Sequence, residues 1–148
     1  MFMKVDYVQE EKIYGMDINT DAYEVCREVK NILDMLSLKY LLDSDQCFDI
    51  KVILCELLQN AIKHGNGCDA NKKIHLDLSF KEGNKILSIT VKDQGCGFNL
   101  NNAGVAYKLD CNPIDLGESG RGLCIVNELC DGMEFNSAGN AVTVLKKL

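Results

Sequence analysis

The chain has 148 residues, of which 47% are hydrophobic and 26% are charged. These proportions predict one globular domain over residues 1–148 and argue against a disordered chain. The net charge of -6 argues against non-specific binding to nucleic acid or anionic membranes, because both need a positive field. The sequence also shows no signal peptide and no apolar run of membrane-spanning length. We therefore expect no nucleic-acid partner and no membrane partner.

The chain contains eight cysteines, and none of them forms the C-x-x-C pair of metal or redox sites. Several stand at apolar positions of helical patterns, where a free cysteine behaves as a small buried hydrophobe. We expect thiols rather than disulfides, a structural role in packing, and a reducing cytoplasmic location.

The first half of the chain predicts one strand and two helices. Residues 12–18 suit a short strand, and residues 19–21 suit a helix start, after which apolar residues recur at helical spacing up to Leu36. Ser44 or Asp45 is a candidate cap for a second amphipathic helix. This helix is expected to end near His64, with Gly65 as its stop.

The second half predicts two hairpins separated by a long irregular stretch and a short helix. Residues 73–80 and 85–92 alternate between apolar and polar, so they suit a hairpin with one buried face. Residues 98–119 lack periodicity, which is typical of a functional lid. Residues 122–130 suit a short apolar helix, and residues 132–136 and 141–147 suit a closing hairpin. The predicted class is α+β, a two-layer α/β sandwich with a mixed, mostly antiparallel sheet and helices on one face.

Polar residues at the end of the second predicted helix are candidates for a nucleotide site. Glu56 and Asn60 are one turn apart, so they lie side by side on one margin of the apolar stripe. Asn60 offers a carbonyl oxygen suited to Mg²⁺, and Glu56 can accept a proton from an attacking hydroxyl or water. The alternative is a pair of solvated polar side chains. Lys63 and His64 are further candidates, although a helix C-terminus favours cations without any ligand.

A strand followed by a glycine-rich turn supplies the second candidate. Asp93 ends the strand and precedes Gly95 and Gly97, which permit positive φ and close approach of a base to the backbone. A carboxylate there can accept a hydrogen bond from the exocyclic amine of adenine, and guanine would leave it unpaired. An ordinary Asp-Gly turn is the alternative.

A third candidate is the glycine-rich segment before the short helix. Gly120, Arg121 and Gly122 would present free backbone N–H groups and a positive helix end to a phosphate. Arg121 could add a charge-assisted contact. The alternative is a glycine-rich helix start without a ligand.

These three segments resemble the N, G1 and G2 boxes of the GHKL (Bergerat-fold) ATPase superfamily, above all its anti-sigma-factor serine kinases. Residues 55–65 match the N box, residues 93–98 the G1 box, and residues 120–123 the G2 box. The likeness covers nearly the whole chain and implies the histidine-kinase-like ATP-binding fold, with ATP and Mg²⁺ as cofactors.

The resemblance also implies a role for each matching residue. It makes Glu56 the general base, Asn60 the Mg²⁺ ligand and Asp93 the residue that recognises the adenine amine. Residues 95 and 97 would shape the base pocket, and Gly120 to Leu123 would hold the phosphates beneath a lid. The implied activity is a serine/threonine kinase that phosphorylates a small STAS-domain anti-anti-sigma protein and binds a sigma factor in partner switching, as a homodimer.

Two positions depart from the family pattern. Gly139-Asn140-Ala141 stands where members often carry Gly-Thr-Thr, and Glu118 stands where some carry an arginine before the G2 box. These departures leave open a non-catalytic module that binds partners under the control of ATP, or a stand-alone ATPase domain of a signalling system. A complete two-component sensor is not expected from 148 residues.

Overall fold

The computed structural model describes residues 10–95 and 117–148. Within these residues the chain forms five strands, three α-helices and one π-helical turn. In chain order they are β1 (Glu10–Asn19), α1 (Ala22–Tyr40), α2 (Ser44–Asn60), the π-helix η1 (Ala61–Gly65), β2 (Lys73–Lys81), β3 (Ile86–Lys92), α4 (Gly117–Leu129), β4 (Gly132–Phe135) and β5 (Ala141–Lys147).

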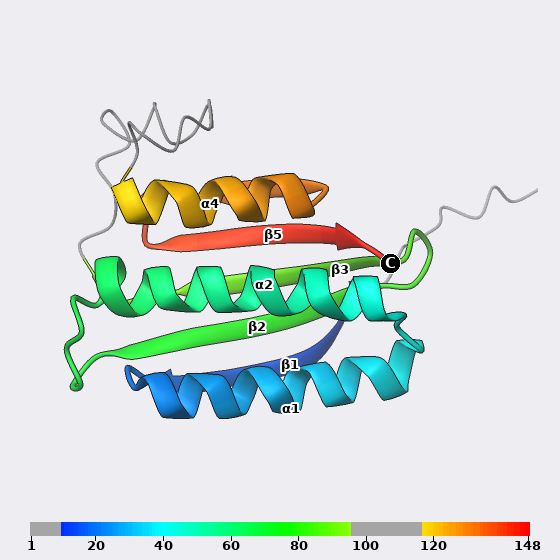
Figure 1. Ribbon diagram of the computed structural model, residues 1–148, viewed down its shortest axis with the longest axis horizontal. Helices are drawn as coiled ribbons and strands as arrows, with labels where there is room; N and C mark the ends of the chain where they lie inside the picture. Colours follow the sequence, from blue (N-terminus) through cyan, green and yellow to red (C-terminus); the bar gives the residue numbers. More distant parts are fainter. Residues whose placement is uncertain (1–9, 96–116) are drawn as a thin grey trace, which may run out of the picture.

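The strands form one sheet in the order β1-β2-β3-β5-β4. Every pairing in the described part of the chain is antiparallel. The helices α1, α2 and α4 lie side by side over one face of this sheet (Figure 1). The predicted α+β two-layer sandwich is therefore confirmed.

The core fills the space between the helices and the sheet because apolar residues recur at helical spacing on the helices and at every second residue on the strands. Side chains of β2 alternate between buried and half-buried along the strand, and those of β3 do the same. The middle helix α2 places an apolar stripe over them. The fully buried side chains include Ile50, Ile53, Leu54, Leu58, Ile74, Leu76, Leu78 and Leu87. Burial of each such side chain stabilises the fold by roughly 1.5–3 kcal/mol.

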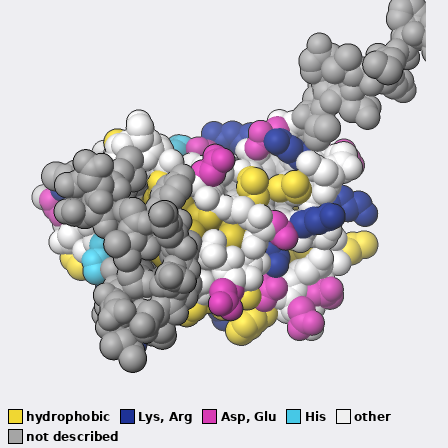
Figure 2. Space-filling model, turned by 90° about the horizontal axis from the view of Figure 1, so that it is seen from above, with side chains coloured by type: hydrophobic (Ala, Val, Ile, Leu, Met, Phe, Trp, Pro, Cys, Tyr) yellow, Lys and Arg dark blue, Asp and Glu magenta, His cyan; other side chains and the backbone are white. Residues whose placement is uncertain are grey.

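The opposite face of the sheet is polar. Thr90 and Thr143 share a hydrogen bond of 2.9 Å across β3 and β5. His75 on β2 lies between two carboxylates, 2.6 Å from Asp17 and 2.7 Å from Asp77. Turned by 90° from the view of Figure 1, the described surface shows acidic and basic side chains interspersed (Figure 2).

The helix starts follow from local capping, with one correction. Asp21 caps α1 by accepting a hydrogen bond from Tyr23 N–H, as predicted. The cap of α2 is Asp43, so the prediction of Ser44 or Asp45 is wrong. Asp43 forms a capping box with Gln46, in which each side chain accepts a hydrogen bond from the other residue's backbone N–H. This reciprocal pair satisfies two N–H groups, which Ser44 and Asp45 could not do from inside the helix.

Two further predictions are corrected by the structure. The helix predicted at residues 122–130 begins five residues earlier, at Gly117, so the end of the predicted irregular stretch is helical. The remainder of that stretch lies outside the described residues. Cys124 is disulfide-bonded, so the prediction that all cysteines are thiols is wrong at this position. Five other described cysteines are free. Among the described helices, each is too short or too polar to span a bilayer.

Candidate functional site

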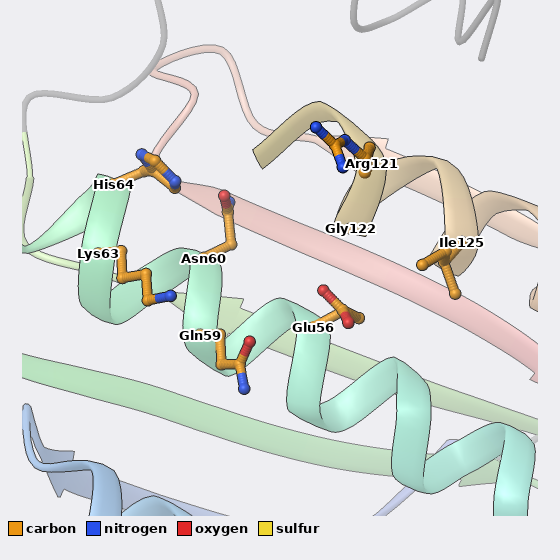
Figure 3. Close-up of a pocket in the computed structure, with 8 residues that line it drawn as sticks. All are labelled: Glu56, Gln59, Asn60, Lys63, His64, Arg121, Gly122 and Ile125. Carbon is orange, nitrogen blue, oxygen red and sulfur yellow. The ribbon is translucent and has the colours of Figure 1, made fainter. Parts of the chain in front are cut away.

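A polar cleft opens between α2 with its π-helical extension and α4. The cleft encloses about 600 Å³ and is open to solvent. Its lining residues come from the N box and from α4 (Figure 3), and they are Glu56, Gln59, Asn60, Lys63, His64, Arg121, Gly122 and Ile125. The structure thus brings together two segments that lie about 60 positions apart in the sequence.

Glu56 and Asn60 point from α2 toward α4, as their spacing predicts (Figure 3). Both side chains are half-buried. Asn60 Oδ1 is buried and has no hydrogen-bond partner among the described residues. An unsatisfied buried acceptor costs about 1–3 kcal/mol, so this atom favours a cation or a donor from a ligand. A hard cation such as Mg²⁺ fits an amide oxygen in this position.

The helix ends in a π-helical turn directly after Asn60. The N–H of Asn66 donates to the carbonyl of Ala61, five residues earlier, at 2.7 Å. The predicted end near His64 lies within one residue of the observed end at Gly65, but the last turn is wider than an α-helical one. Turns of this kind are rare and occur frequently at functional sites. Lys63 and His64 lie in this turn and line the cleft as exposed side chains.

A second, smaller pocket adjoins the cleft, and the two share Asn60. It lies between the end of α2 and the sheet, and its space of about 250 Å³ includes open solvent. Apolar groups make most of its wall, and among the described residues Asp93 is the only ionisable one that lines it. The lining residues are Leu57, Asn60, Ala61, Val91, Asp93, Phe135, Gly139, Asn140, Ala141 and Val142. An apolar slot with a single carboxylate suits a flat heterocycle that carries an amine.

Asp93 is held by backbone groups on both sides. Its N–H donates to the carbonyl of Asn140 at 2.9 Å, and its Oδ1 accepts from Gly95 N–H at 2.8 Å. Burial raises the pKa of the Asp93 carboxyl, while the bond from Gly95 and the charge of Lys72 act in the opposite direction. The carboxylate is therefore partly desolvated, which strengthens any hydrogen bond that it accepts from a ligand.

Glycines allow the end of the π-helical turn to approach Asp93 and the turn after it closely. A Cβ on Gly65 would overlap the Asp93 carboxylate, and a Cβ on Gly95 would overlap the carbonyl of Gly65. Neither glycine has a positive φ, so close approach rather than an unusual backbone conformation is what requires them. Gly97, the other predicted glycine of this turn, lies outside the described residues.

The G2 segment differs from its prediction. Because α4 begins at Gly117, the N–H groups that lack a helical acceptor belong to its first turn. Gly120 is in this turn, but Arg121 and Gly122 lie beyond it, so the prediction that all three precede the helix is wrong. Arg121 is exposed and lines the cleft, whereas Leu123 is 3% exposed and packs into the core. The side chain of Leu123 therefore does not reach the cleft.

Asn66 is a supporting residue that sequence reasoning missed. Its side chain is only 2% exposed and links three segments. It donates to Thr20 Oγ1 at 2.9 Å and to the carbonyl of Lys73 at 3.0 Å, and it accepts from Gln94 N–H at 2.8 Å. Asn66 therefore anchors the residue directly after Asp93. The sequence signal was an Asn-Gly pair after the N box, which indicates only a turn.

Comparisons with known proteins agree with this geometry. The sequence model of the histidine kinase-like ATPase domain matches residues 20–146. An anti-sigma F factor of Clostridium perfringens (strain SM101 / Type A) is 34% identical over 106 residues, which cover 70% of this chain and 73% of that protein. An anti-sigma F factor of Geobacillus sp. (strain WCH70) is 28% identical over 102 residues, covering 68% and 67%. One of Oceanobacillus iheyensis is 27% identical over 108 residues, covering 70% and 71%.

Proposed function

Since this chain belongs to the histidine kinase-like ATPase family and, within it, to the anti-sigma-factor group, we propose that it is an ATP- and Mg²⁺-dependent protein serine/threonine kinase. Its substrate is a small STAS-domain anti-anti-sigma protein, and its second partner is a sigma factor that it sequesters in the cytoplasm. One observation carries the proposal. An apolar slot with one carboxylate adjoins a polar cleft with an unsatisfied amide oxygen, and Asn60 belongs to both.

The slot is proposed to bind adenine. The exocyclic amine of adenine donates a hydrogen bond to the Asp93 carboxylate, and the apolar walls pack against the faces of the ring. Guanine carries a carbonyl at the corresponding position, so it would leave a half-buried carboxylate unpaired. Discrimination between the two bases therefore depends on Asp93 being ionised.

The cleft is proposed to hold the phosphates. Asn60 Oδ1 would be a ligand of Mg²⁺, which neutralises phosphate charge when bound. Lys63 and Arg121 line the same cleft and would supply positive charge to the phosphate oxygens, and His64 beside them would add a ring N–H donor. These contacts offset the repulsion expected between a polyphosphate and a chain of net charge -6.

Glu56 is proposed as the general base. The partner's serine or threonine oxygen forms a bond to the γ-phosphorus while the bond to the leaving oxygen of ADP breaks. Glu56 accepts the hydroxyl proton during this step. Its half-buried position at the edge of the cleft and its orientation toward α4 support this role.

The test is phosphoryl transfer from labelled ATP to the STAS-domain protein encoded by a neighbouring gene. We expect transfer by the wild type, and loss of transfer but not of ATP binding in Glu56→Gln. Glu134→Gln is the matched control, because Glu134 is an exposed carboxylate on β4 that lines neither pocket. Absence of transfer by the wild type, or undiminished transfer by Glu56→Gln, contradicts the kinase proposal.

ATP binding without transfer would instead favour a non-catalytic module whose partner binding depends on nucleotide. We also propose a homodimer, which sedimentation of the full chain with and without ATP would test. A strictly monomeric chain in both conditions would contradict that part of the proposal.

A further inference from the structure

Gly122 on α4 lies directly against the carboxylate of Glu56 on α2. A Cβ at position 122 would be 2.5 Å from Glu56 Oε2, 3.5 Å from its carboxyl carbon and 3.9 Å from its Cβ. Apart from its chain neighbours and the nearby backbone of α4, the three nearest described atoms to that point all belong to Glu56. Both residues line the cleft (Figure 3). The carboxylate therefore occupies the space that any larger residue at position 122 would need.

The backbone of α4 gives no other reason for a glycine here. Gly122 is in the interior of a helix that runs from Gly117 to Leu129, and its φ is not in the left-handed region. Glycine is less favourable than alanine in such a position, because it loses more conformational freedom on folding. Its N–H also lies beyond the first turn, where free N–H groups would meet a phosphate. The remaining reason for a glycine at position 122 is that a Cβ there would collide with the Glu56 carboxylate.

We propose that Gly122 is a positioning residue that keeps the Glu56 carboxylate at the edge of the cleft, in the place from which it accepts the hydroxyl proton. The inference rests on the proposed function of Glu56. A methyl group at position 122 would displace Oε2, and the flexible glutamate side chain could move aside without disturbing the core. The fold would tolerate the change. The rate of phosphoryl transfer would fall, because a shift of about 1 Å in the position of a catalytic group can reduce a rate by about 10²-fold.

The test separates stability, nucleotide affinity and transfer in Gly122→Ala. We expect an unchanged or higher melting temperature, an ATP dissociation constant within about threefold of the wild type, and a kcat for transfer reduced by at least about tenfold. The KM for ATP should stay the same. Asn127→Ala, at an exposed position of α4 that does not line the cleft, is the control for a gain in helix propensity alone and should leave kcat unchanged.

A double-mutant cycle with Glu56→Ala tests the contact without using activity. Once the carboxylate is removed, Gly122→Ala displaces nothing, so its gain in melting temperature should be larger in the Glu56→Ala background than in the wild type. If Gly122→Ala alone fails to fold while the double variant folds, the contact is equally supported. Equal gains in both backgrounds would overturn the proposal.

Two other outcomes would also overturn it. One is a kcat that Gly122→Ala leaves unchanged. The other is a loss of ATP affinity as large as the loss of transfer, because that would assign Gly122 to phosphate binding. If the wild type transfers no phosphoryl group, the kinase proposal fails by itself, and the stability cycle still decides whether Gly122 makes space for Glu56.

Discussion

Replacement of Asn66 by alanine should destabilise the fold and weaken ATP binding together. The buried amide joins the end of β1 through Thr20, the start of β2 through the carbonyl of Lys73, and the turn after Asp93 through Gln94 N–H. Alanine keeps the backbone bond of residue 66 but removes all three side-chain bonds.

The magnitude follows from those three bonds. Each contributes about 1 kcal/mol net, and the buried groups left unpaired raise the cost, so we expect a loss of about 3 kcal/mol in the free energy of unfolding. A loss of that size is a large fraction of the roughly 5–15 kcal/mol typical of a domain. It should lower the melting temperature by about 10 °C. Release of the Gln94 anchor should reduce ATP affinity about fivefold, since one hydrogen bond of about 1 kcal/mol corresponds to that factor.

Urea denaturation and calorimetric titration with ATP would measure both effects. Asn71→Ala is the matched control, because Asn71 is an exposed asparagine in the same connection, and its change should stay within about 0.5 kcal/mol. If Asn66→Ala unfolds at the wild-type urea midpoint and binds ATP with wild-type affinity, the argument that this amide supports the Asp93 turn is refuted.

Three further predictions concern Gly65, Asp93 and His75. Gly65→Ala should reduce ATP affinity at least about tenfold in titration, because its Cβ would overlap the Asp93 carboxylate; wild-type affinity would contradict this. Burial raises the Asp93 pKa, so ATP affinity should fall on acidification with a midpoint above the ordinary aspartate range, and Asp93→Asn should abolish this dependence. The hydrogen bond to Asp17 has the largest effect and raises the His75 pKa, burial opposes it, and the hydrogen bond to Asp77 and the charges of both carboxylates raise it further. The resulting stability should be complete below about pH 6.5 and lost as the pH rises through the folded-state pKa, so the difference in urea midpoint between wild type and His75→Gln should shrink from pH 6 to pH 9.

Structural features that depend only on the spacing of apolar residues within one segment were predictable from the sequence. The alternation in β2 and β3 fixed which side chains face the helices, and a spacing of four residues placed Glu56 and Asn60 on one side of α2. These features need only the geometry of one element.

Features that depend on distant partners or on weak local preferences were not predictable. The start of α4 was placed too late because Gly117-Glu118-Ser119-Gly120 has poor helix propensity, which the structure overrides. The π-helical turn has no signature in Ala61–Gly65, since those residues would equally suit an α-helix. The role of Asn66 depends on partners at positions 20, 73 and 94, which no local pattern connects.

The π-helical turn explains how one segment can serve both pockets. Asn60, at the end of α2, is shared by the cleft and the slot, and the wide turn that follows leads to Gly65 against the Asp93 carboxylate. The turn closes at Asn66, whose side chain is fixed to two strands. The position of the Asn60 amide oxygen and the position of the Asp93 carboxylate are thus set by the same few bonds. Contacts to the phosphates and contacts to the base should therefore respond together to any change in this turn, whereas changes in α4 should affect only the phosphate side.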